Sequence, residues 1–289
     1  MDLTVHPAAT VIVLRDAGPA PEVFMVRRHE GTAFLGGAHV FPGGRVDASD
    51  RETAHERWCD GIAGAAARFA DLPPVDAVAY HVAAARELFE EAGVLLARDE
   101  AGEFVSLAGA SARARIAQDR RDVHGRGLTL AGIVEREGLR LALDALVPFA
   151  HWVTPPIDVR RFDTRFFVAR MPPRQTPAHD ETETTESVWM TAAEAIARCE
   201  RDEIVLPPPT WTTLREIESF GSVDAVMAWA RARRIARREP MFLEQDGQKM
   251  LLLAGDPLNP ERPATADPTP AETRFVLVDG RWRAEAGRT

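Results

Sequence analysis

A nine-residue segment with three glutamates constrains this chain more than any other part of its sequence. It runs from Arg86 to Val94 and reads Arg-Glu-Leu-Phe-Glu-Glu-Ala-Gly-Val. An α-helix turns by 100° per residue, so Glu87, Glu90 and Glu91 fall within an arc of about 100°. Apolar residues occupy the opposite side of the same helix. One face can therefore pack against a core while the other carries three carboxylates.

This clustering of like charges is unfavourable for an isolated helix. Glu87 is repelled by Glu90 at i,i+3 and by Glu91 at i,i+4, and the helix dipole disfavours anions in the last turn. Only Arg86 offsets the repulsion, which leaves a local cost of about 1–2 kcal/mol. Such violations of local rules often mark functional sites. A divalent cation would relieve the repulsion, and oxygen ligands suit magnesium or manganese. A solvated acidic face is the alternative interpretation.

The surrounding sequence predicts where this helix begins and ends. Asp76 is expected to N-cap a helix over 77–92, and Gly93 to end it in a left-handed conformation. The alanine- and charge-rich stretch from Arg51 to Ala70 also predicts a helix. The other predictions are strands over 9–15, 23–28, 152–153, 165–169 and 186–190, helices over 191–199, 210–220 and 223–238, and hairpins over 241–253 and 273–283.

Charge and composition exclude several classes of protein. The 289 residues carry a net charge of −9, and Lys249 is the only lysine, which argues against a generic nucleic-acid binder. No apolar run approaches the ~20 residues of a membrane span, and the N-terminus lacks a secretory pattern. The two cysteines form neither a disulfide framework nor a zinc pattern, so we expect a cytoplasmic location.

The carboxylate segment matches the pattern R-E-U-x-E-E-x-G-U, with U aliphatic, at every specified position. It resembles the C-terminal half of the box that defines Nudix hydrolases, G-x5-E-x7-R-E-U-x-E-E-x-G-U. The N-terminal half resembles residues 44–50, although Asp50 stands where the box has glutamate. The 35 residues from Arg51 to Ala85 stand where the box has about seven, so the box is split by an insertion.

A split box is typical of one branch, and the chain is similar to the peroxisomal coenzyme A diphosphatases among the Nudix hydrolases. Further segments carry this likeness: residues 38–44, 161–167, 206–210 and 255–257. The resemblance implies an α/β fold, a Nudix-type α/β/α sandwich around a mixed sheet. It places the Nudix domain over 1–240, a helical box insertion at about 51–78, and a C-terminal extension of hairpins and loops over 241–289, packed on that domain.

The resemblance also implies roles for residues. Glu87, Glu90 and Glu91 are expected to bind Mg²⁺ or Mn²⁺ or to activate water, and the carbonyl of Gly43 to complete the coordination. A further catalytic glutamate often comes from a later loop. Glu183 and Glu186 are the candidates for a fourth ligand or general base, with a solvated acidic loop as the alternative.

Residues that contact the diphosphate are less sharply defined. Arg27 and Arg28 end a strand that faces the probable cleft and are candidates for phosphate binding, although solvent exposure explains them equally well. Gly44 and Arg86 complete the expected substrate-binding set, with Arg86 favoured as an orienting partner for the carboxylates. Trp152 is a candidate for stacking on adenine, and core packing is its alternative.

The sequence therefore predicts a metal-dependent hydrolase of a small diphosphate substrate. Coenzyme A or an acyl-coenzyme A is favoured, giving 3',5'-ADP and a 4'-phosphopantetheine product. Other Nudix substrates, such as ADP-ribose, NADH or a nucleotide sugar, stay open, as does a Nudix-like ligand sensor without catalysis. No nucleic acid or membrane partner is expected, and homodimerisation is left open.

Overall fold

A mixed sheet organises the protein. The computed structural model describes residues 4–31, 35–52, 55–124, 127–158, 160–180, 184–260 and 271–287. The main sheet has eight strands in the order β10-β2-β1-β9-β8-β11, with β3 paired to β2 and β4 paired to β1. Their bounds are β1 Val5–Asp16, β2 Pro21–Arg28, β3 His39–Val40, β4 Gly43–Arg45, β8 Val147–Val153, β9 Arg161–Arg170, β10 Thr184–Thr191 and β11 Arg237–Arg238. The β1–β9 and β8–β11 pairs are parallel, and the other pairs are antiparallel.

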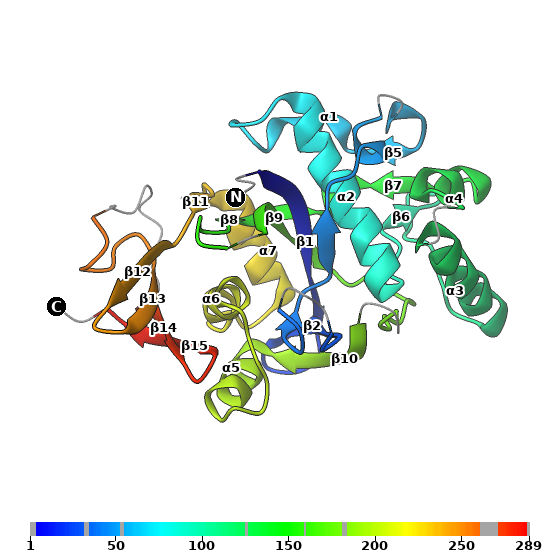
Figure 1. Ribbon diagram of the computed structural model, residues 1–289. Helices are drawn as coiled ribbons and strands as arrows, with labels where there is room; N and C mark the ends of the chain where they lie inside the picture. Colours follow the sequence, from blue (N-terminus) through cyan, green and yellow to red (C-terminus); the bar gives the residue numbers. More distant parts are fainter. Residues whose placement is uncertain are drawn as a thin grey trace.

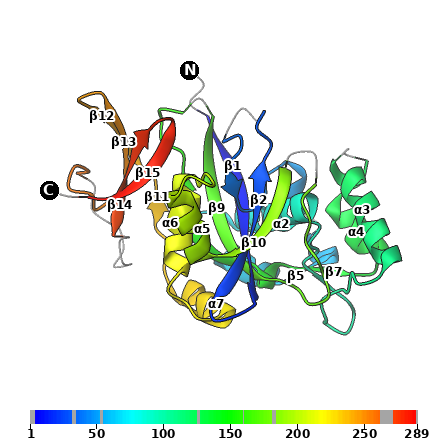
Figure 2. The ribbon, with the colours of Figure 1, turned by 90° about the horizontal axis from the view of Figure 1, so that it is seen from below.

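Helices cover both faces of this sheet (Figure 2). One face carries α2, and the other carries the three later helices: α2 Pro74–Ala92, α5 Ala192–Glu200, α6 Pro208–Ile217 and α7 Val223–Ala232. Successive residues of a strand point to opposite faces. Val11 and Val13 accordingly pack in the core under α2, while Ile12 and Leu14 pack in the core under the later helices. The predicted α/β/α sandwich is confirmed.

The carboxylate helix begins slightly earlier than predicted. Pro73 occupies the N-cap and Pro74 the first helical position, where a missing N–H costs nothing. The capping role predicted for Asp76 is therefore wrong, and its carboxylate lies in the first turn, where the helix dipole favours an anion. The predicted end is confirmed, because Gly93 has φ 67° and donates its N–H to the carbonyl of Phe89.

The insertion before α2 is less helical than predicted. A single helix from Arg51 to Ala70 is wrong, because the chain there forms short pieces around Gly61, whose φ is 79°. A β-carbon at Gly61 would lie 2.8 Å from the backbone nitrogen of Asp144, so a close approach requires glycine. The pieces are η1 Ser49–Arg51, η2 His55–Arg57, β5 Cys59–Asp60 and α1 Ile62–Ala67. Strand β5 joins a second sheet, in which β7 Arg140–Ala142 lies between it and β6 Ala97–Arg98.

Two further helices stand beyond α2, on the side away from the main sheet (Figure 2). They are α3 Ala110–His124 and α4 Leu130–Arg136, and a 3₁₀ turn, η3 Leu143–Ala145, follows β7. None of the helices in the described ranges has the length and hydropathy that a bilayer crossing requires.

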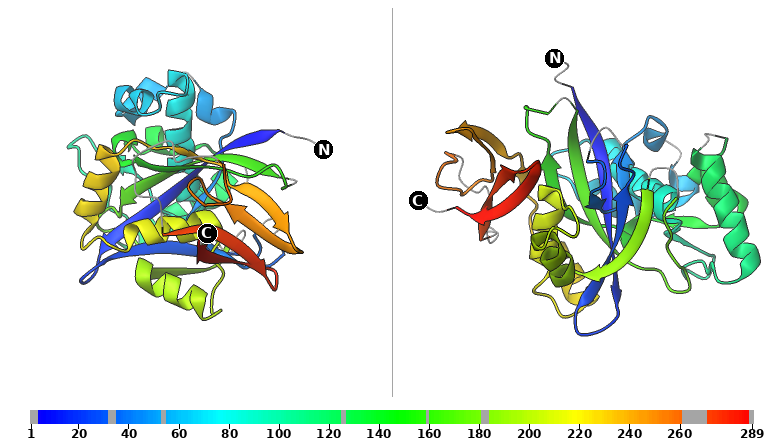
Figure 3. Two further views of the ribbon diagram at one scale, coloured as in Figure 1. Left: turned by 90° about the vertical axis from the view of Figure 1, so that its left-hand side faces the viewer. Right: turned by 60° about the horizontal axis from the view of Figure 1, so that its bottom comes forward.

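The C-terminal region forms a separate antiparallel sheet at the opposite end of the molecule (Figures 1 and 3). Its strands follow chain order: β12 Met241–Gln245, β13 Gln248–Leu252, β14 Glu272–Val278 and β15 Arg281–Ala286. Both predicted hairpins are confirmed, since Asp246-Gly247 and Asp279-Gly280 have the positive φ values of two-residue turns. Phe275 of this sheet packs edge-on against Trp211 of α6, with ring centroids 5.8 Å apart. The C-terminal sheet thereby shares a core with the main domain.

Candidate active site

Arg86 is the hub of the carboxylate cluster on α2. Its guanidinium makes five hydrogen bonds, which equals the number of N–H donors that an arginine has. Two go to Asp50, both at 2.9 Å, and one to the carbonyl of Arg45 at 2.8 Å. The remaining two reach Glu87 at 2.9 Å and Glu90 at 3.1 Å. With every donor in use, the structure favours an orienting role for Arg86 over direct contact with substrate.

The glycines of β4 allow the backbone to meet these carboxylates closely. The N–H of Gly43 donates to Glu91 at 3.0 Å, which fixes the orientation of the Pro42–Gly43 peptide. A β-carbon on Gly44 would lie 2.5 Å from Oε1 of Glu87, so any side chain there would displace that carboxylate. A β-carbon on Gly43 would collide with the backbone of Ala9 and Thr10 on β1. The Gly-Gly pair is therefore a steric requirement of the site.

Glu87 lies in an environment that disfavours its charge. Burial raises the pKa of its carboxyl to about 8, and the nearby carboxylates of Glu90 and Asp50 act in the same direction. The guanidinium of Arg86 opposes this shift without cancelling it. Burial and like charges together penalise the ionised form. A divalent cation beside Glu87 would remove that penalty.

Asp50 belongs to the candidate site, although the sequence pattern did not indicate a role for it. Its side chain is 2% exposed and holds Arg86 through a two-pronged ion pair. It also accepts the N–H of Asp47 at 2.7 Å, which closes the turn that follows β4. Aspartate stands here at the glutamate position of the box, and because of that departure no role was predicted for it. The preserved carboxylate was the signal that could have identified it.

Arg120 is a second contributor that the sequence did not indicate. It projects from α3 and donates twice to the carbonyl of Glu90, at 3.2 and 2.9 Å. Its charge therefore lies at the C-terminal end of α2, where the helix dipole favours a cation. Arg86 is thus not the only cation that offsets the clustered glutamates. Nothing in the local sequence links two residues 30 positions apart.

The donor set suits a hard divalent cation. Carboxylate and carbonyl oxygens are the ligands that Mg²⁺ and Mn²⁺ prefer. The glycine cradle and the uncompensated burial of Glu87 point to the same use. In the described part of the chain, however, no three His, Cys, Asp or Glu side chains form a ready-made metal cage. Glu87 and Glu90 instead converge on Arg86.

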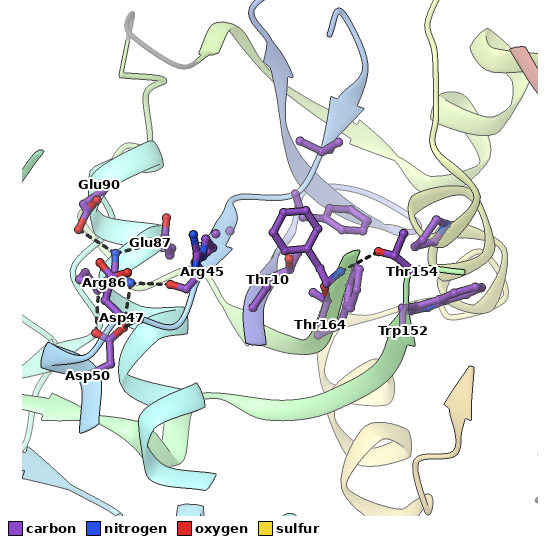
Figure 4. Close-up of a pocket in the computed structure, with 18 of the residues that line it drawn as sticks. Thr10, Arg45, Asp47, Asp50, Arg86, Glu87, Glu90, Trp152, Thr154 and Thr164 are labelled. Atoms are coloured by element: carbon purple, nitrogen blue, oxygen red, sulfur yellow. Dashed lines mark hydrogen bonds and ion pairs between the residues drawn. The ribbon is translucent and has the colours of Figure 1, made fainter. Parts of the chain in front are cut away.

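The carboxylates open onto a large cavity of about 1210 Å³ (Figure 4). Asp50, Arg86, Glu87 and Glu90, together with the glycines of β4, line what we call the carboxylate end. In Figure 4 these side chains lie to one side, while Thr154 and Trp152 lie to the other. Glu91 is 5% exposed and lies behind this lining, against Gly43.

The other predicted site residues are placed differently. Arg28 lines the cavity, and its Nε is buried without a hydrogen-bond partner among the described residues. Arg27 instead pairs with Glu30 at 2.7 Å and is not among the described lining residues. Glu186 is exposed on β10, opposite Arg27, and is also absent from that lining. Glu183 lies outside the described residues.

Comparison with known proteins gives one consistent relationship. A family model described as the NUDT19 Nudix domain matches residues 64–217. Curated relatives named acyl-coenzyme A diphosphatase NUDT19 include one from Homo sapiens and one from Gallus gallus. The human protein is 30% identical, with the alignment covering 82% of this chain and 72% of the relative. The chicken protein is 29% identical, with 84% and 74% covered.

A solved structure extends the likeness to the fold. The crystal structure of a NUDIX hydrolase from Alicyclobacillus acidocaldarius superposes with a TM-score of 0.67 at 29% sequence identity. The match covers 79% of this chain and 97% of that one. The resemblance drawn from the split box is thereby confirmed. The chain belongs to the Nudix hydrolases, in the branch defined by the NUDT19 Nudix domain.

Proposed function

We propose that this protein hydrolyses the diphosphate linkage of coenzyme A or an acyl-coenzyme A, giving 3',5'-ADP and a 4'-phosphopantetheine product. The observation that carries the proposal is the relationship to proteins named acyl-coenzyme A diphosphatase, at 24–30% identity over 82–84% of the chain. The cavity supports it, because its carboxylate end continues into space large enough for a long substrate.

We infer that Glu87, Glu90 and Glu91, together with the carbonyl of Gly43, would hold a magnesium or manganese ion. When bound, such an ion would supply charge neutralisation for the diphosphate and activation of a water molecule. Two features of the chain keep these groups in place. The N–H of Gly43 donates to Glu91 and holds this glycine beside the carboxylates, and Arg86 ties Glu87 and Glu90 together.

Binding of the diphosphate is assigned to Arg28. Its partly buried guanidinium lines the cavity, and a charge-assisted hydrogen bond to phosphate would satisfy its unpartnered Nε. Gly44 lines the same cavity, and its lack of a side chain leaves room for the carboxylate of Glu87. Glu183 and Glu186 remain the predicted sources of a fourth ligand or general base.

A substrate panel tests the proposal. The protein is incubated with coenzyme A, ADP-ribose, NADH and a dinucleoside polyphosphate in Mg²⁺ or Mn²⁺, and the products are identified by chromatography. We expect coenzyme A to be cleaved to 3',5'-ADP, with turnover lost in excess EDTA and restored by either metal. Faster consumption of ADP-ribose or NADH would assign another Nudix specificity. Ligand binding without metal-dependent turnover would establish the sensor alternative.

The cellular setting remains a prediction. Both cysteines are free thiols, which fits a reducing compartment such as the cytoplasm. Burial raises the pKa of the Cys59 thiol to about 12, so this residue is not suited to redox chemistry. Homodimerisation stays open, and sedimentation of the purified protein would decide it.

A further inference from the structure

The cavity extends from the carboxylate end, beside α2, to the other face of the main sheet, where Trp152 and Phe166 belong to the core under the later helices. Arg45, Ala8, Thr164 and Trp152 are successive register partners on β4, β1, β9 and β8, and all four line the cavity. Directly opposite residues in a sheet share one face, so this row forms a continuous floor. Adjacent strands lie about 4.8 Å apart, so the row spans about 14 Å. A floor of this length suits an extended ligand chain better than a ligand that consists of a single ring.

The far end of this floor is enclosed by segments that are distant in sequence. We call it the apolar arm and define it by Trp152, Phe166, Pro208, Leu251 and Trp282, all of which line the cavity. Trp152 and Phe166 come from the main sheet, and Pro208 begins α6. Leu251 and Trp282 come from strands β13 and β15 of the C-terminal sheet. The extension therefore contributes directly to the wall of the cavity that contains the carboxylates.

Trp152 adds a polar feature to this apolar wall. The residue is 3% exposed, and its indole N–H has no hydrogen-bond partner among the described residues. A buried donor without a partner is costly, whereas a ligand acceptor would satisfy it. The hydroxyls of Thr10, Thr154 and Thr164 also line this part of the cavity (Figure 4). The arm thus combines apolar surface with scattered hydrogen-bonding groups.

We propose that the C-terminal sheet is a specificity element, and that the apolar arm binds the pantetheine chain attached to the diphosphate, with Trp282 and Leu251 at its wall. This inference rests on the proposed function. A pantetheine chain is uncharged and alternates methylene groups with amides, which matches the wall chemistry. The other half of coenzyme A carries a further phosphate and would need several cations. The described part of the loop beside the arm contributes the cation Arg160 to the cavity lining, and it also contributes the anion Asp158. The two charges cancel, so this loop does not favour a further phosphate.

The two halves of coenzyme A provide the test, because binding them requires no turnover. Titration calorimetry in Mn²⁺ measures the affinity of the holoprotein for 4'-phosphopantetheine and, separately, for 3',5'-ADP. Trp282→Ala is expected to weaken 4'-phosphopantetheine binding about tenfold, equivalent to about 1.4 kcal/mol. It should weaken 3',5'-ADP much less. In steady-state assays the same variant should raise KM for coenzyme A more than it lowers kcat.

Matched variants separate this role from a structural one. Phe242 is the register partner of Leu251 and packs on the same core, but it is not among the described lining residues. Phe242→Ala should therefore leave both affinities within twofold. Leu251→Phe places a larger side chain in the arm and leaves less space for a ligand. It should therefore also weaken 4'-phosphopantetheine binding selectively, and it does so without truncating Trp282. Trp282→Phe retains a ring and should recover part of the lost affinity.

The outcomes distinguish the two proposals. If Trp282→Ala and Leu251→Phe weaken both halves equally, or weaken only 3',5'-ADP, the assignment of the arm is overturned. The same holds if Phe242→Ala reproduces their effect. If the wild-type protein binds 4'-phosphopantetheine through the arm but does not cleave coenzyme A, the proposed function fails and the arm assignment stands.

Discussion

The two ends of the cavity are built in different ways. The carboxylate end is largely local, since Arg86, Glu87 and Glu90 lie close together on one helix. Asp50, β4 and Arg120 complete their contacts. The apolar arm joins five elements, from Trp152 on β8 to Trp282 on β15. In our proposals the chemistry belongs to the local end and substrate choice to the non-local end.

The largest expected effect comes from a substitution that disrupts only the carboxylate end. Glu90→Gln keeps the size of the side chain and removes the charge that would hold the metal, so kcat should fall by about two to three orders of magnitude. The loss should be similar for every substrate that the wild type cleaves, and it is measured by steady-state assays. Glu135→Gln, an exposed position on α4, serves as the control. A loss confined to coenzyme A would contradict the division between the two ends.

The next effect concerns Asp50, which positions the guanidinium of Arg86. Asp50→Asn removes the carboxylate that forms a bidentate ion pair with the guanidinium of Arg86. The side chain of Asp50 is only 2% exposed, so water cannot easily replace that ion pair. We expect about 2 kcal/mol of lost stability, because the guanidinium of Arg86 loses one of its three carboxylate partners. We also expect kcat to fall about 10–100-fold, as for removal of a residue that orients metal ligands. Thermal melts and steady-state kinetics measure the two effects.

Asp50→Glu provides the matched comparison, because it restores the residue found in the family box. It should recover most of the activity and stability that Asp50→Asn loses, at unchanged KM. Equal damage by both substitutions would mean that the position tolerates no change of shape, and that the carboxylate of Asp50 does not act through Arg86.

The sequence predicted the carboxylate end well for a physical reason. Helical periodicity alone places Glu87, Glu90 and Glu91 on one side, and Gly93 ends the helix because only glycine adopts φ 67° without strain. Asp50 and Arg120 were not foreseen, since their contacts to α2 join residues 36 and 30 positions apart. Periodicity carries no information about such long-range pairs.

The insertion and the apolar arm show more clearly which features could not be predicted from local sequence. The alanine-rich stretch over 51–70 has helical propensity, but β5 pairs with β7 from a segment about 80 residues away, and tertiary pairing overrides propensity. The hairpins of the C-terminal sheet were predictable from Asp-Gly turns, whereas their packing against α6 was not. The role of Trp282 in the cavity wall depends entirely on that packing.

A smaller effect is expected at Arg28, which we assign to the diphosphate between the two ends of the substrate. Arg28 lines the cavity with a buried, unpartnered Nε, while its neighbour Arg27 pairs with Glu30 outside the described lining. Arg28→Ala should raise KM about tenfold for all diphosphate substrates, because it removes a charge-assisted hydrogen bond. Arg27→Ala should change KM less than twofold. An unchanged KM for Arg28→Ala in steady-state assays would show that its guanidinium does not contact the diphosphate.

The smallest effect examines the polar feature of the apolar arm. Trp152→Phe retains an aromatic ring on β8 and removes the indole N–H that has no partner among the described residues. If that N–H donates to an amide carbonyl of the bound chain, its loss should cost about 1 kcal/mol and raise KM for coenzyme A about fivefold. Binding of 3',5'-ADP, measured by calorimetry, should change much less, because that half does not reach the arm. Should 3',5'-ADP lose affinity instead, Trp152 would face the nucleotide, and the arm would need to be reassigned to the other half of the substrate.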